Sequence, residues 1–253
     1  MIYSSIHDFL NDGAPSNISF CCSNFGAIDL ALNLVESCKK NGFPISFFAI
    51  DSQASDYMSD YCDVINYYGG INHKLPITQN LSTKYSKFDS KEFNSLNWCG
   101  WEIAMDILAS GRSAMKIDTD IVVNRNFEKE MLDMLNPNQF DLLVQEGQGG
   151  KLCAGFSAIH PKSYSKFKNI FCHKTLARYK YFNRSDQEIL RSMVMGKRIK
   201  IKLLDRNLYP NGGYYFGHYE SIDSICNIVH FNCLLGGLKE KMDHMKRYGY
   251  WYL

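Results

Sequence analysis

The sequence predicts an α/β protein with a mostly parallel central sheet flanked by helices. Its 253 residues are 45% hydrophobic and 21% charged, which supplies a sizeable core and excludes a disordered, collagen-like or coiled-coil chain. Near the N-terminus an apolar strand, an amphipathic helix and a second apolar strand follow one another. Such a βαβ unit joins parallel strands by a right-handed crossover. We therefore expect a single α/β domain over residues 1–253.

Hydrophobic periodicity defines the opening unit. Asn17–Cys22 is an apolar run of strand length, and Ile28–Cys38 keeps apolar residues on one helical face until a glycine stop. Ile45–Ile50 is a second strand of the buried type, and it ends at Asp51. The polar stretch Ser52–Ser95 gives no comparably clear pattern.

Helices and strands continue to alternate along the rest of the chain, with no repeat, linker or low-complexity segment. The elements expected there are, in order, a helix over Leu96–Leu108, a strand over Ala114–Ile117, an extended segment Ile121–Val123, a helix over Phe127–Leu135, strands over Asp141–Gln145 and Cys153–His160, a helix from Pro161 to about Ala177, a helix over Asp186–Met195, a strand over Lys200–Leu204, a turn with aromatic flanks at Tyr209–Phe216, a strand over Asn227–Phe231 and a helix over Leu238–Arg247.

Charge, cysteine content and hydropathy limit the partners and the compartment. Lys and Arg exceed Asp and Glu by 28 − 26 = 2, so no strong field attracts nucleic acid or an anionic membrane. The nine cysteines are irregularly spaced without a C-x-x-C pair, which is typical of thiols in a reducing cytosol. Met1–Phe20 lacks the apolar core of a signal peptide, and no apolar run is long enough to cross a bilayer. We expect a cytoplasmic protein with no membrane span.

The sharpest short motif is Asp118-Thr119-Asp120, a D-x-D sequence directly after the strand Ala114–Ile117. Carboxylates two residues apart at a strand end point the same way and can reach one divalent cation. In open α/β sheets, ligands bind at the carboxyl ends of the strands, which favours a metal site over a solvated turn.

Two further motifs carry candidate chemistry. In V-H-F-N-C-L-L-G-G-L-K, His230 follows a strand and offers an imidazole ligand, while Gly236 and Lys239 suit an anion at a helix N-terminus. A hydrogen-bonded core histidine and a helix-entry turn explain the same residues. In S-D-Q-E-I-L, Asp186 and Gln187 start a helix, where acidic and capping residues are common without any further role.

Taken together, these segments resemble the nucleotide-diphospho-sugar transferase family that includes rhamnogalacturonan xylosyltransferases. The resemblance extends from about Ile18 to Tyr252 and is carried, in this order, by S-N-F-G-A-I-D-L-A-L-N-L (Ser23–Leu34), D-T-D, A-G-F (Ala154–Phe156), D-Q-E-I-L, Y-P-N-G and H-F-N…G-x-x-K. It implies a single GT-A (Rossmann-like) domain with a nucleotide-binding half at about 17–123 and a half for donor sugar and acceptor at about 124–253. It also implies a nucleotide-sugar donor and a divalent cation, manganese in the first place and magnesium as the alternative.

The resemblance also implies a role for individual residues. By role, these are Asp118, Asp120 and His230 for the metal; Ser23, Asn24 and Asp51 for the nucleoside; Gly236 and Lys239 for the diphosphate; Ala154 and Gly155 for the donor sugar; and Asp186 and Gln187 beside the anomeric carbon. The chain departs from the family at two positions. Cys153 stands where the family often has Asn, and a basic residue common in the helix before D-x-D is replaced near Gly100.

The activity implied is metal-dependent transfer of a hexose or pentose from a UDP-sugar or similar donor to a glycan or other hydroxyl acceptor, with retention of configuration. An inverting enzyme would need an acceptor-side base, for which Glu146 is the candidate. The aromatic residues considered as platforms for an acceptor sugar are Trp98, Trp101, Tyr209, Tyr214, Tyr215 and Tyr219. The alternatives are a non-catalytic GT-A-like module that binds a nucleotide or glycan, and a sugar-nucleotide nucleotidyltransferase. The latter calls for a Gly-rich, Arg-containing loop that Ser23–Leu34 does not supply.

Overall fold

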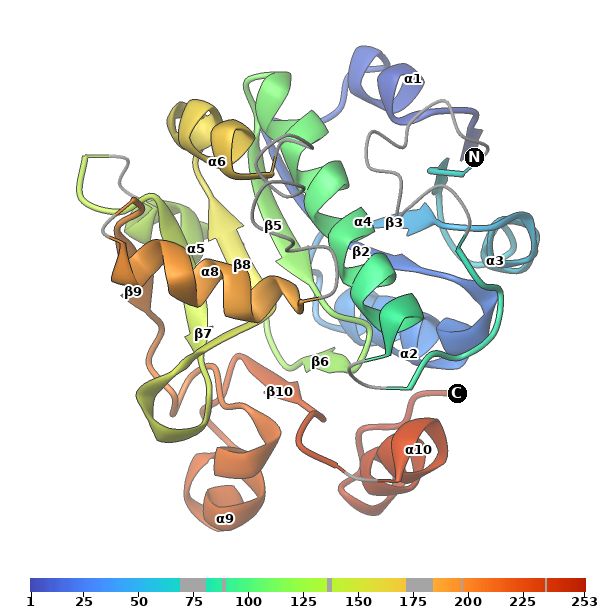
Figure 1. The fold of residues 1–253 in the computed structure, drawn as a ribbon. Helices are drawn as coiled ribbons and strands as arrows, with labels where there is room; N and C mark the ends of the chain where they lie inside the picture. The colour runs from blue at the N-terminus through green and yellow to red at the C-terminus, as the bar shows by residue number, and fades with distance from the viewer. Residues whose placement is uncertain (69–80, 88–89, 136–137, 172–183, 197, 235) are drawn as a thin grey trace.

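The computed structural model describes residues 1–68, 81–87, 90–135, 138–171, 184–196, 198–234 and 236–253 (Figure 1). Among them, an eight-stranded sheet has the order β1-β4-β3-β2-β5-β8-β7-β9. Its strands are β1 (Ile2–Tyr3), β2 (Asn17–Ser23), β3 (Ser46–Ala49), β4 (Val64–Asn66), β5 (Ser113–Ile117), β7 (Leu142–Glu146), β8 (Leu152–Ile159) and β9 (Ile201–Leu203). Within this sheet β8 runs antiparallel to both of its neighbours, and the other neighbouring strands pair in parallel. The predicted mostly parallel α/β sheet is confirmed.

Helices cover both faces of this sheet (Figure 1). Those that share one apolar core with it are α1 (Ile6–Asn11), α4 (Lys91–Ala109), α6 (Tyr164–Phe171) and α8 (Asp186–Met195). Those that share the core of the opposite face are α2 (Ile28–Lys40), α3 (Ser52–Met58) and α5 (Glu128–Met134). Short 3₁₀ helices lie at Phe25–Ala27, Gln148–Gly150 and Pro161–Ser163. The sheet is therefore the middle of three layers.

A second, two-stranded sheet lies beside the end of β5. It pairs β6 (Ile121–Val123) antiparallel with β10 (Ile228–His230), and His230 lies opposite Ile121. Helices α9 (Gly212–Ile222) and α10 (Gly237–Arg247) pack around it in an aromatic core (Figure 1). This pairing brings the C-terminal part of the chain next to the D-x-D turn.

The predicted βαβ opening is present as β2, α2 and β3. Buried side chains of β2 alternate between the two faces, since Phe20 contributes to the core that contains α4 and Cys21 to the core that contains α2. Strand β2 pairs in parallel with both β3 and β5. The carboxyl ends of these strands therefore open at one edge of the sheet.

The turn predicted at Tyr209–Phe216 is wrong over most of its length, because helix α9 begins at Gly212. The Asn211 side chain caps this helix by accepting a hydrogen bond from the Tyr214 N–H at 3.1 Å. Gly212 and Gly213 disfavour a helix by intrinsic propensity. The helix is nevertheless stabilised by Tyr215, which is fully buried in the aromatic core.

Other differences concern segments with weak periodicity. Elements β1, α1, α3 and β4 had no counterpart in the sequence analysis, although β1 pairs with β4 and β4 with β3 at the edge of the sheet. The helix predicted from Pro161 begins as a 3₁₀ turn and continues as α6 to Phe171. Its predicted end at Ala177 lies outside the described residues.

The cysteines that the structure describes are free thiols, as predicted, and Cys172 lies outside the described residues. Burial raises the pKa of Cys62 to about 11 and that of Cys22 to about 12, so both thiols stay protonated at neutral pH. None of the helices in the described ranges is both long and apolar enough to cross a bilayer.

Two glycines of α9 make a matched pair of mutations. A Cβ at Gly212 would overlap the Asn232 carbonyl and approach the His230 carbonyl oxygen to 2.9 Å, whereas a Cβ at Gly217 has no atom within 4 Å. We expect Gly212→Ala to lower the free energy of unfolding by about 1–3 kcal/mol through overpacking. Gly217→Ala should raise it by about 0.5–1 kcal/mol through helix propensity. Urea unfolding of both variants measures this, and equal effects would contradict the packing of α9 on β10.

Candidate functional site

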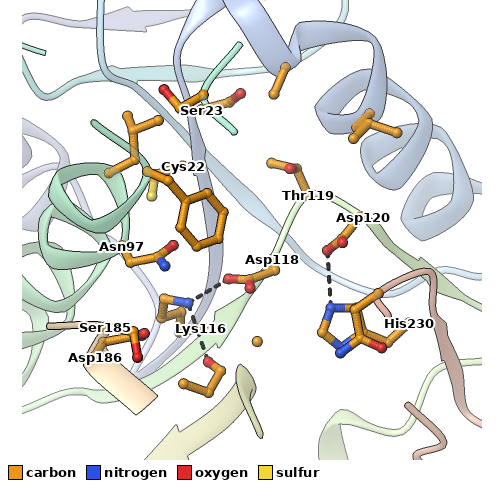
Figure 2. A pocket seen from close by; sticks show the side chains of 18 of the residues that line it. Cys22, Ser23, Asn97, Lys116, Asp118, Thr119, Asp120, Ser185, Asp186 and His230 are labelled. Atoms are coloured by element: carbon orange, nitrogen blue, oxygen red, sulfur yellow. Dashed lines mark hydrogen bonds and ion pairs between the residues drawn. The ribbon is translucent and has the colours of Figure 1, made fainter. Parts of the chain in front are cut away.

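A cavity of about 190 Å³ opens at the carboxyl ends of β2 and β5 (Figure 2). Its walls come from these two strands and the turns after them, from α2, α4, β8, α8, β10 and α10, and from residues 85–86. The predicted site residues that line it are Ser23, Asn24, Asp118, Asp120, Ala154, Gly155, Asp186, Gln187 and His230. The fold thus collects residues from distant parts of the chain in one cavity.

The D-x-D turn and β10 form a candidate metal cluster. Asp118 and Asp120 follow β5, and the antiparallel pairing of β6 with β10 places His230 beside them. Ligand atoms of the three side chains all lie within 4.8 Å of one another. The Asp120 Oδ1 atom is 3.1 Å from His230 Nε2 (Figure 2). Two carboxylates and an imidazole are a ligand set that can hold a divalent cation.

Gly155 of β8 leaves space beside this cluster. A Cβ at this position would overlap the His230 ring and come within 2.9 Å of the Asp118 Oδ2 atom. Only a residue without a side chain therefore allows these two groups to face the same space. The close approach of Asp118, Asp120 and His230 would allow the three groups to share one ion.

Each carboxylate of the cluster is paired with a lysine. Asp118 Oδ1 lies 2.5 Å from Lys116 Nζ, and Asp120 Oδ2 lies 2.5 Å from Lys241 Nζ. Burial raises the pKa of Asp120, but the charges of Lys241 and His230 outweigh this effect and hold it well below its usual range. Asp120 is therefore ionised at neutral pH.

His230 is fully enclosed between Asp120 and Gln145. Burial lowers its pKa, but the Asp120 charge outweighs burial and raises the pKa to about 10. On the other side of the ring, Nδ1 lies 2.7 Å from Gln145 Oε1. With both nitrogens engaged, the ring has a fixed orientation in the cavity.

Asp186 and Gln187 occupy the wall next to Lys116. The Asp186 carboxylate accepts hydrogen bonds from Trp101 Nε1 and from the Gln187 N–H, both at 2.8 Å. The Gln187 Oε1 atom accepts one from the Ala154 N–H at 3.4 Å. These contacts fix the Asp186 charge at the cavity surface.

Gly100 makes room for a positively charged side chain in the wall of the cavity. A Cβ at Gly100 would lie 2.8 Å from Lys116 Cε, so the glycine of α4 makes room for the lysine of β5. Burial lowers the Lys116 pKa, but Asp118 and Asp186 outweigh this and raise it above its usual value. Helix α4 has no basic residue at Gly100, and the positive charge next to this position is that of Lys116 (Figure 2).

Three predicted site residues are not brought to the cavity. The Asp51 carboxylate caps α3 through the Ala54 N–H at 2.8 Å and holds the Phe25 N–H at 2.9 Å. The Gly236 N–H donates to the Glu240 side chain. Lys239 is exposed on α10, because Lys241, two residues further on, takes the inward position.

The candidates for acceptor contacts also lie elsewhere. Glu146 faces Arg206 at 3.9 Å and does not line the cavity. Four of the six aromatic platforms are core residues with at most 1% exposure, namely Trp98, Trp101, Tyr209 and Tyr215. Tyr214 and Tyr219 are partly exposed on α9 and do not line the cavity either.

The polar cavity residues that were not selected from the sequence include Asn97, Lys116, Asn232 and Lys241. Asn232 donates to the Cys153 sulfur at 3.4 Å, so an amide lies beside the position where an Asn was expected. A lysine inside the apolar strand Ser113–Ile117 was the one available sequence signal, because Lys is almost never buried unless it is paired.

Known proteins match most of the chain. A family model described as nucleotide-diphospho-sugar transferase matches residues 45–245. A UDP-galactose:fucoside alpha-3-galactosyltransferase of Dictyostelium discoideum is 26% identical over an alignment of 274 residues, which covers 91% of this chain. The chain spans 42% of the length of that curated relative.

Two solved structures share the fold. Mouse xyloside xylosyltransferase 1 matches with a TM-score of 0.57 at 10% identity, over 86% of this chain and 98% of its own. The glycosyltransferase GlyE of Streptococcus pneumoniae matches with a TM-score of 0.57 at 13% identity, over 94% of this chain and 60% of its own. These likenesses confirm the GT-A fold.

The space beside Gly155 gives a direct test of the metal cluster. We expect Gly155→Ala to weaken Mn²⁺ binding about tenfold or more, because the new methyl group displaces His230 and Asp118. Ser157→Ala on the same strand is the control, since its buried hydroxyl has no hydrogen-bond partner among the described residues. Calorimetric titration with Mn²⁺ measures both variants. Unchanged affinity in Gly155→Ala would rule out this cluster.

Proposed function

The chain belongs to the nucleotide-diphospho-sugar transferase family, and we propose that it is a glycosyltransferase that depends on a divalent cation. Its donor is a nucleotide-diphosphate sugar and its acceptor is a hydroxyl group of a glycan. The observation that carries the proposal is the meeting of the Asp118–Asp120–His230 cluster with Asp186 and Gln187 in one cavity.

Asp118, Asp120 and His230 would hold the cation, Mn²⁺ in the first place and Mg²⁺ as the alternative. When bound, such a cation supplies Lewis-acid stabilisation of the departing diphosphate. The close approach of the three ligand groups, for which Gly155 leaves room, supports this assignment. Ser23 and Asn24, at the end of β2, would contact the nucleoside from the opposite wall.

Lys241 is the residue that we assign to the diphosphate, in place of Lys239. Its ammonium group already lies in the cavity on Asp120. Burial lowers the Lys241 pKa, but Asp120 outweighs this and raises it, so the residue is charged. A fixed charge at this point favours the negative charge that develops on the leaving group. Gly236 cannot offer its N–H, which Glu240 occupies.

Asp186 would act on the donor sugar as a fixed negative charge. Breaking the bond between the anomeric carbon and the phosphate oxygen gives the sugar positive character, which a carboxylate beside it stabilises. Two hydrogen bonds hold Asp186 in place, and Lys116 balances its charge. Ala154, Gly155 and Gln187 would line the same sugar.

We propose retention of the anomeric configuration. An inverting reaction requires a free carboxylate base on the acceptor side. Among the described lining residues, the carboxylates are Asp118, Asp120 and Asp186, and Glu146 is directed to Arg206. In a front-face reaction the acceptor oxygen bonds to the anomeric carbon as the phosphate oxygen leaves, and the acceptor proton passes to that leaving oxygen.

The Dictyostelium relative favours a particular donor and acceptor. Its name specifies UDP-galactose and a fucoside, so we propose a UDP-hexose as donor and a fucose-containing glycan as the first acceptor to test.

Nucleotide binding tests the function directly. We expect UDP, but not GDP, dTDP or CDP, to stabilise the protein when Mn²⁺ is present and to lose this effect in EDTA. At a hundredfold excess over Kd the gain is about 2.7 kcal/mol, or roughly 5–10 °C in Tm for a chain of this size. Release of UDP from UDP-galactose with a fucoside then measures transfer. Binding without turnover would indicate a non-catalytic module, and no shift with any nucleotide would refute the proposal.

Lys241 and Lys239 form a matched pair on one helix. We expect Lys241→Met to raise the Kd for UDP at saturating Mn²⁺ at least about tenfold, because a charge-assisted contact is worth about 1.5–3 kcal/mol. Lys239→Met, which removes an exposed charge of the same kind, should change it less than about twofold. Fluorescence titration measures both. A larger increase in Kd for Lys239→Met than for Lys241→Met would return the assignment to Lys239.

A further inference from the structure

Gln145 is a fully buried amide at the end of β7. The register between β7 and β8 shifts between Val144 and Gln145, so that Val144 lies opposite Ser157 but Gln145 lies opposite Cys153. A bulge of this kind re-aims a side chain out of the regular alternation, and such bulges are common next to functional sites. The Gln145 side chain reaches from here to β10 and to the segment before α9.

The direction of the Gln145 amide follows from its partners. The Nε2 atom lies 3.1 Å from the Tyr209 carbonyl oxygen and 2.9 Å from the Pro210 carbonyl oxygen. A carbonyl oxygen only accepts hydrogen bonds, so the NH₂ group must face these two atoms and use both of its hydrogens. The Oε1 atom therefore faces the remaining partner, His230 Nδ1, at 2.7 Å.

This arrangement determines which nitrogen of His230 keeps its hydrogen when a cation binds. An oxygen acceptor 2.7 Å from Nδ1 requires a hydrogen on Nδ1. The other nitrogen, Nε2, lies 3.1 Å from the Asp120 Oδ1 atom, which accepts its hydrogen, so a cation that binds to Nε2 takes the place of that hydrogen. The Cys153 sulfur is a weaker competitor for Nδ1, at 3.9 Å.

We propose that Gln145 is a positioning residue that fixes His230 with its hydrogen on Nδ1, so that the Nε2 lone pair is directed to a divalent cation. The inference rests on the proposed metal dependence. A metal-bound histidine normally donates its second N–H to an oxygen acceptor such as a carboxylate or a carbonyl group. Loss of that acceptor typically lowers the metal affinity about 10–100-fold.

The segment Tyr209–Gly212, which supplies the two carbonyl groups that contact Gln145, is itself held in place by several contacts. Asn211 forms a bridge with His230, and its side chain donates to the Glu146 carbonyl oxygen at 2.7 Å. The Gly212 N–H donates to the Asn232 side chain at 2.7 Å. The segment is thus bonded to both β7 and β10, and these contacts fix the positions of the two carbonyl groups that orient Gln145.

The first test compares Mn²⁺ affinity in two variants. Gln145→Met has a similar shape without hydrogen bonds, and we expect it to weaken Mn²⁺ binding about 10–100-fold. Gln145→Glu keeps an oxygen acceptor for His230 Nδ1 when its second oxygen is protonated toward the Tyr209 and Pro210 carbonyl oxygens, and we expect its affinity to exceed that of Gln145→Met. Equal affinity of Gln145→Met and the unaltered protein would overturn the inference.

A double-mutant cycle separates positioning from packing. In a His230→Ala background, Gln145→Met should change Mn²⁺ affinity less than about twofold, because its effect passes through His230. The same loss in both backgrounds would show that Gln145 only supports the structure and would overturn the inference. Failure of the unaltered protein to bind Mn²⁺ would refute the proposed metal dependence as well.

A measurement without mutation covers the case in which Gln145→Met does not fold. Nitrogen-15 spectra of the histidine rings in the Mg²⁺-loaded protein, which is diamagnetic, distinguish a protonated from an unprotonated ring nitrogen. We expect His230 to carry its hydrogen on Nδ1 and none on Nε2. The reverse assignment would overturn the inference.

Discussion

Two carboxylates, the partly buried Asp118 and the buried Asp120, lie side by side at the end of β5, and the surrounding structure is arranged to neutralise them. Like charges in a low-dielectric site repel each other and are costly to desolvate, so they require cations close by. One comes from the strand itself as Lys116, and the other comes from α10 as Lys241. The packing of β10 on β6 then adds His230. The C-terminal elements therefore complete a centre that begins in the middle of the chain.

The parts of the fold that sequence could predict are those with local signals. The β2–α2–β3 unit follows from periodicity, and the helix Asp186–Met195 follows from its Ser185 cap and apolar face. The D-x-D pair could be placed because a strand end is a definite position in an open sheet. The helix α9 could not be found this way, because its stability comes from burying Tyr215 among aromatic residues far away in the sequence.

The same distinction separates the site residues. Asp118, Asp120, His230, Asp186 and Gln187 stand in recognisable motifs, and all of them line one cavity. The choice between Lys239 and Lys241 depends on the rotation of α10 about its axis, which no local pattern of charges reveals. The sequence pattern places Gln145 only at the end of a strand, because its side-chain contacts lie 64 residues or more along the chain. Such residues become visible only when the partners are brought together.

The contact between Gly100 and Lys116 has an evolutionary consequence. Because a side chain at position 100 would take the space that the Lys116 stem occupies, neither residue can change size alone without a cost. The two positions are therefore epistatic. The space between helix α4 and strand β5 holds one long, positively charged side chain, which can come from either position but not from both. A relative could carry the cation on the helix and a small residue on the strand, and it would reach that state through paired rather than single substitutions.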